Sequence, residues 1–130
     1  MTDDGLSGFQ VIGLDHVQIA IPRGSEAEAR KFFVSGLGFV EVEKPANLKA
    51  KGGAWFLCGS HQIHVGVTDN FIAAKKAHPA ILVRGIVAYR KELESRGLKT
   101  RDEDPLPGAV RFYLDDPFGN RLEFLEWIER

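Results

Sequence analysis

Hydrophobic and polar positions follow the same order twice along this chain. The first series opens at residues 14–21, where apolar and polar side chains alternate as in a half-buried strand, and continues with a helix from about Ser25. Ser25 and Glu28 have the spacing of a capping box, and glycines follow the predicted helix and end it. Shorter strands are predicted at residues 39–42, 54–58 and 62–67, with a loop at residues 45–53.

The second series repeats this order of elements. A strand at residues 78–83 precedes a helix at 85–96, and further strands are predicted at 98–100, 110–114 and 121–126, with a loop at 102–108. Each series therefore reads strand, helix, strand, strand, strand. The pattern predicts an α+β fold of two tandem βαβββ modules within one domain formed by the whole chain. The first module spans about residues 13–68 and the second about 77–128.

The polar faces of the strands carry a set of candidate metal ligands. In the first and last strand of each module the apolar side chains can pack under the helix, so the polar side chains point away from it. Three histidines and one glutamate lie on this helix-free face: His16, His64, His78 and Glu123. The first and third are 78 − 16 = 62 residues apart, and the second and fourth 123 − 64 = 59. Two sheets curving into one cup, with the helices outside, would gather all four.

Four ligand-type residues at matching places of a repeat predict a bound divalent metal, although a single strand histidine is more often an ordinary polar residue. Three imidazoles and a carboxylate favour Zn, Ni, Fe, Co or Mn over Ca or Mg. Arg111 and Tyr113 share a strand face under strict alternation, and they are the candidate substrate contacts. His61 is expected at the surface, and Cys58 is expected to be a small buried hydrophobic residue.

Composition narrows the expected partners and location. The chain is 44% hydrophobic and 27% charged, as in ordinary globular domains, and its net charge of −1 gives no attraction to nucleic acid or to an anionic membrane. No apolar run approaches the roughly 20 residues that span a bilayer. An acidic N-terminus without signal-peptide features and a single cysteine fit a cytoplasmic protein. The expected partner is a small-molecule substrate.

Four segments resemble the vicinal oxygen chelate superfamily, which includes glyoxalase I, methylmalonyl-CoA epimerase, extradiol dioxygenases and the fosfomycin- and bleomycin-resistance proteins. The segments are LDHV at residues 14–17, IHVGV at 63–67, AHPA at 77–80 and DPFGNRLE at 116–123, of which the last is the most specific. The resemblance implies a curved, mostly antiparallel sheet cup and the metal role for the quartet. It implies a metal that binds two substrate oxygens and stabilises an enolate-like or oxyanionic intermediate. It also suggests a homodimer, with each cup built within one chain or from two.

Where this sequence departs from the family patterns, it favours some of the possible functions over others. Glyoxalase I usually has a glutamate where this chain has His64, so Glu123 is the one ligand carboxylate that could move a proton. The leading interpretation is a glyoxalase I-like lyase or an isomerase or epimerase acting on a small oxygenated substrate. A small-molecule binding or antibiotic-resistance protein is the alternative. A non-haem iron extradiol-type dioxygenase is the second alternative, because Tyr113 fits that signature while residues 105–107 lack its histidine.

Overall fold

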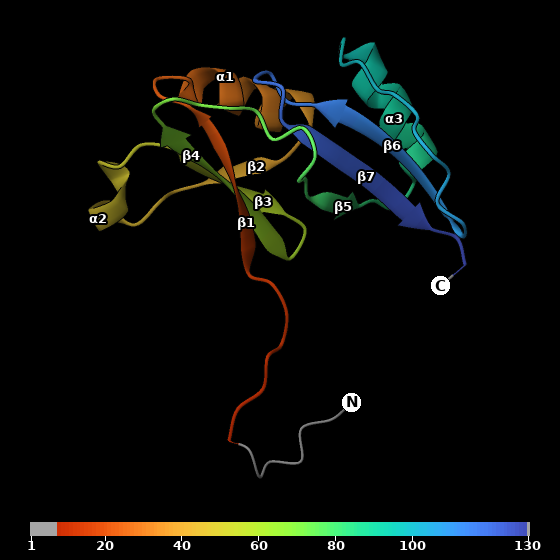
Figure 1. The fold of residues 1–130 in the computed structure, drawn as a ribbon, viewed down its shortest axis with the longest axis horizontal. Coiled ribbons are helices and arrows are strands. Elements are labelled where there is room, and N and C mark those ends of the chain that lie inside the picture. Colours follow the sequence, from red (N-terminus) through yellow and green to blue (C-terminus); the bar gives the residue numbers. More distant parts are fainter. Residues whose placement is uncertain (1–7, 130) are drawn as a thin grey trace.

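Two small sheets of mixed strand direction form the fold (Figure 1). The computed structural model describes residues 8–129. In both sheets the first strand of the module runs parallel to its last strand, which is antiparallel to the strand before it. The first sheet has the order β1 (His16–Pro22), β4 (His61–Thr68), β3 (Ala54–Cys58) and β2 (Val40–Val42), and the second has the order β5 (Ala80–Leu82), β7 (Arg121–Trp127) and β6 (Ala109–Asp115).

The longer helix of each module lies on the same side of the sheets (Figure 1). The first module has α1 (Glu26–Arg30), which continues as the π-helical segment η1 (Lys31–Gly36), and a short α2 (Ala46–Lys49). The second module has α3 (Ile86–Ser95). None of the helices in the described part of the chain is long and apolar enough to cross a membrane. The α+β fold of tandem βαβββ modules predicted from the sequence is confirmed, although the second module, as described, has three regular strands instead of four.

Apolar strand faces and helix stripes meet in the core between the sheets and the helices. Phe33 of η1 stacks on Phe56 of β3 with ring centroids 5.0 Å apart, and Phe112 of β6 stacks on Phe124 of β7 at 5.2 Å. All four rings are almost completely buried. Because alternate strand residues point to opposite faces, this packing directs the intervening polar side chains to the helix-free side.

Three local predictions need correction. Ser25 does not cap α1, because its hydroxyl donates to the carbonyl of Pro22 instead of accepting a helix N–H. Residues 98–100 do not form a regular strand, and only the isolated bridge between Arg101 and Tyr113 remains. Side chains bind this stretch to α3, since Thr100 accepts a hydrogen bond from Arg90. The loop at residues 45–53 contains α2, whose start is favoured by the fixed φ of the preceding proline.

A buried amide joins the two modules. Asn120, the residue just before β7, is 2% exposed. Its Nδ2 donates to the carbonyl of Ala20 in β1 at 2.9 Å and to Oδ2 of Asp116 at 2.8 Å, and its Oδ1 accepts from the backbone N–H of Ala74 at 2.9 Å. One side chain thus connects the first strand, the linker between the modules and the last turn. Burial raises the pKa of Asp116, while the hydrogen bonds that it accepts oppose that rise.

Candidate metal centre

The first module holds its two candidate ligands in a stack of rings. The imidazoles of His16 in β1 and His64 in β4 are nearly parallel, with centroids 4.0 Å apart. Trp55, which is opposite His64 in the β3–β4 pair, stacks on that ring at 4.1 Å. Nδ1 of His16 is 2.9 Å from Oδ2 of Asp15, and Nε2 of His64 is 2.8 Å from Oε1 of Gln62. We call His16 and His64 the first half-site.

Burial is the main influence on the charge of His64, which is 4% exposed. Burial lowers the pKa of His64, and the neighbouring His16 lowers it further. The shift favours the neutral ring, since both effects oppose a second positive charge in this stack. A neutral imidazole is the form that binds a metal ion, so the surroundings of His64 suit it to that role.

The second module presents its two candidate ligands in direct contact. Nε2 of His78 is 2.9 Å from Oε1 of Glu123 in β7, and Nδ1 of His78 is 2.7 Å from the carbonyl oxygen of Lys76. The second carboxylate oxygen of Glu123 accepts a hydrogen bond from Nη1 of Arg111 at 3.3 Å. Glu123 is only 6% exposed, so these contacts hold its carboxylate in place. We call His78 and Glu123 the second half-site.

Arg111 and Tyr113 lie beside the second half-site on the same strand face, as the alternation predicted. The Arg111 guanidinium lies over the Tyr113 ring at 5.4 Å, and the Tyr113 ring meets that of His78 edge-on at 5.6 Å. Arg121 covers the same tyrosine at 5.0 Å. The sequence interpretation missed Arg121, although its alternation with Glu123 along β7 could have indicated it. Burial, followed by the charge of Glu123, raises the pKa of Tyr113, so its hydroxyl stays protonated at neutral pH.

The four predicted ligands form two pairs within one chain. Across residues 8–129, no three His, Cys, Asp or Glu side chains lie close enough together to hold a metal ion. The chemistry of the donors nevertheless fits a divalent transition metal. His78 lies two residues before β5, although the sequence pattern placed it in that strand. In His16 and in His78, Nδ1 contacts an oxygen, from Asp15 or from the Lys76 carbonyl, and Nε2 of His78 faces Glu123. Metal-binding histidines are commonly held by their second nitrogen in this way.

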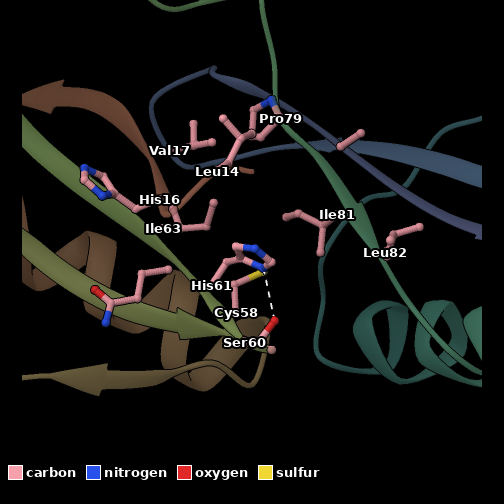
Figure 2. Close-up of a pocket in the computed structure, with 13 residues that line it drawn as sticks. Leu14, His16, Val17, Cys58, Ser60, His61, Ile63, Pro79, Ile81 and Leu82 are labelled. Atoms are coloured by element: carbon pink, nitrogen blue, oxygen red, sulfur yellow. Dashed lines mark hydrogen bonds between the residues drawn. The ribbon is translucent and has the colours of Figure 1, made fainter. Parts of the chain in front are cut away.

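A groove of about 490 Å³ separates the two modules between β1 and β5 (Figure 2). Its lining is mostly apolar and includes Leu14, Ile63 and Leu82, while His16 stands at its edge. His61, the first residue of β4, is exposed as predicted. Cys58 is only partly buried and packs against the core, and burial raises the pKa of its thiol.

Solved structures provide the comparison with known proteins. A glyoxalase family protein from Bacillus anthracis is 47% identical, with a TM-score of 0.89, and the match covers 92% of this chain and 98% of that one. A lactoylglutathione lyase from Agrobacterium tumefaciens is 17% identical, with a TM-score of 0.69 and coverages of 88% and 92%. The fosfomycin resistance protein FosX from Listeria monocytogenes is 15% identical, with a TM-score of 0.65 and coverages of 90% and 92%.

The first of these matches is strong enough to establish the family. This chain belongs to the glyoxalase family, within the vicinal oxygen chelate superfamily. At their low identities, the lyase and FosX show a shared fold. No protein-family model matches the sequence, and no curated protein matches it.

Proposed function

We propose that this protein is a divalent-metal-dependent enzyme of the glyoxalase I-like type, a lyase or an isomerase or epimerase that moves a proton on a small oxygenated substrate. The observation that carries the proposal is the pair of half-sites. They occupy corresponding places of two repeated modules, with His16, His64 and Glu123 on strands and His78 two residues before β5. Membership of the glyoxalase family supports the same conclusion.

The residues of the two half-sites suggest a division of roles. His16, His64, His78 and Glu123 would hold the ion, which when bound would polarise two oxygens of the substrate. Glu123 is the proposed acid–base group, because it is the only carboxylate among the four. Arg111 orients that carboxylate through its contact with Oε2. Arg111 and Tyr113 are also the proposed substrate contacts, since both lie on the open face next to Glu123.

A homodimer would complete the centre. The two half-sites form separate pairs within the described chain, and neither alone offers more than two ligands. We propose that the first half-site of one chain faces the second half-site of its partner. An apolar segment before β1 supports association, because Val11 is 89% exposed and Ile12 is 90% exposed. This segment extends away from the sheets on the side opposite the helices (Figure 1). We call residues 9–14 the N-terminal arm.

Metal reconstitution tests the proposed function. We expect the purified protein, stripped with a chelator and incubated with Mn, Fe, Co, Ni or Zn, to bind one divalent ion per chain. Inductively coupled plasma mass spectrometry gives the stoichiometry, and solvent proton exchange into a bound 2-oxo or 2-hydroxy compound gives the activity. Glu123→Gln should abolish proton exchange. A protein that takes up no ion after reconstitution would contradict the proposal.

The same experiment separates the other candidates. A small-molecule binding or resistance protein would bind its ligand equally well after chelation, and the structural likeness to FosX keeps this class open. An extradiol-type dioxygenase would consume oxygen with a catechol and Fe(II). Residues 105–107 lack the histidine of its signature, and the carbonyl of Asp104, just before them, accepts a hydrogen bond from Arg111.

The N-terminal arm supplies a test of the dimer. We expect Val11→Asp combined with Ile12→Asp to weaken dimerisation by about a hundred-fold or more, because each apolar side chain contributes about 1.5–3 kcal/mol when buried. Light scattering during gel filtration, over a dilution series, measures the change. Val87→Asp is the matched control, since Val87 is 63% exposed on α3. If both variants have the dissociation constant of the original protein, the arm has no part in the dimer.

A further inference from the structure

A second hollow lies beside the first half-site on the open face of the first sheet. It has a volume of about 270 Å³, and its lining includes Gln18, Lys44, Leu48, Lys51, Trp55 and Val67. Trp55 connects it directly to the half-site, since the indole stacks on His64 at 4.1 Å. A molecule with one end at the half-site could therefore place its other end in this hollow.

The hollow carries positive charge. Neither Lys44 nor Lys51 takes part in an ion pair within the described part of the chain. The Lys44 ammonium donates to the carbonyl of Gly52, which holds it at the hollow and leaves further N–H donors free. The Glu26 carboxylate accepts the backbone N–H of Gly53 at 3.0 Å. The residues that line the hollow include two lysines and no carboxylate, so the lining itself is positively charged.

Two glycines allow close contacts in the lining of the hollow, one with backbone and one with a side chain. Gly53 has φ +83°, and a Cβ there would be 2.2 Å from the carbonyl oxygen of Val65, so the loop can press against β4 only because this residue is glycine. On the floor, a Cβ at Gly66 would be 2.6 Å from Nε2 of Gln18. The missing side chain thus lets the Gln18 amide lie over β4, and this amide forms no hydrogen bond within residues 8–129.

We propose that this hollow binds an oxyanion, a carboxylate or a phosphate, at the end of the substrate remote from the reacting atoms. Lys44 and Lys51 supply the opposite charge, Gln18 supplies an amide donor, and Trp55 and Leu48 enclose the adjoining apolar part. The inference rests on the proposed function, and it makes the substrate an organic acid or a phosphate ester. Two cations and a neutral donor around one space are a common arrangement for binding such a group.

Metal-free protein provides the test, so that the result does not depend on the metal centre. A Trp127→Phe background leaves Trp55 as the single tryptophan and reports binding by fluorescence. Inorganic phosphate and succinate are titrated separately at low ionic strength, and calorimetry repeats each titration. We expect saturable binding of at least one anion. The anion that binds more tightly identifies the group that the substrate carries.

Lysine variants connect that binding to the hollow. Lys44→Ala combined with Lys51→Ala should weaken it by at least about ten-fold, whereas Lys75→Ala combined with Lys76→Ala should leave it unchanged. Lys51→Ala alone keeps the contact between Lys44 and Gly52 and should weaken binding less, and Lys51→Arg should restore it. Absence of saturation with both anions, or equal losses in the two double variants, would overturn the inference. Metal stoichiometry, measured separately on the same variants, should stay unchanged.

Discussion

Mixing two metal-free variants is expected to restore metal binding. The first variant carries His16→Ala and His64→Ala and loses the first half-site, while the second carries His78→Ala and Glu123→Gln and loses the second. Each variant alone should bind the divalent ion at least about a hundred-fold more weakly than the original protein, because changing even an outer partner of a ligand costs 10–100-fold. After subunit exchange between them, about one quarter of the sites should regain full affinity.

The expected recovery of one quarter of the sites follows from the two-fold symmetry of a dimer. Random exchange makes half of the dimers mixed, and a mixed dimer has one site with both half-sites intact and one with neither. A site built within one chain would give no recovery at all, since every chain in the mixture carries one damaged half-site. Metal content per chain after gel filtration gives the result. Each variant refolded alone is the control, and its melting temperature shows whether loss of metal binding reflects loss of the fold.

Replacing Asn120 is expected to give one of the largest losses of stability of any single substitution outside the aromatic core. Asn120→Ala leaves the Ala20 carbonyl, the Ala74 N–H and one oxygen of Asp116 without their partner. Buried groups that lose hydrogen bonds cost about 1–3 kcal/mol each, and partial access of water reduces the sum, so we expect a decrease of about 2–4 kcal/mol in the free energy of unfolding. Urea denaturation followed by circular dichroism measures it.

The matched control is Asn47→Ala on the exposed surface of α2, which should change the free energy of unfolding by less than about 0.5 kcal/mol. Asn120→Asp should be at least as damaging as Asn120→Ala, because it places a second carboxylate against Asp116 and removes the donor to Ala20. An Asn120→Ala variant as stable as its control would mean that the modules do not depend on this junction.

The same asparagine lies within residues 116–123, the most specific part of the family resemblance. Asp116 accepts the backbone N–H groups of Phe118 and Asn120, which closes the turn before β7. This turn fixes where β7 begins, and so it decides to which face of the sheet the Glu123 side chain points. The sequence indicated that the segment matters, but its role at the junction depends on Ala20, a hundred residues away, and no local pattern could show that contact.

The local predictions of secondary structure that were wrong have a common cause. The sequence interpretation used spacing within short windows, and spacing is reliable where burial of one face enforces it, as in β1, β4, β6 and β7. Spacing gave wrong predictions at Ser25 and at residues 98–100, where side chains bind non-local or competing partners. Polar side chains have several possible hydrogen-bond partners of similar energy, and tertiary packing selects among them.

By itself the sequence determined the tandem order of the two modules and the strand faces of His16, His64 and Glu123, because the two-residue period of a strand decides which side chains are buried. Only the tertiary structure decided that these three and His78 form two pairs, that Trp55 stacks on the first pair, and that Lys44 and Lys51 share a hollow beside it. Distances between strands and loops far apart in the chain depend on how the sheets curve and pack, which no periodicity encodes.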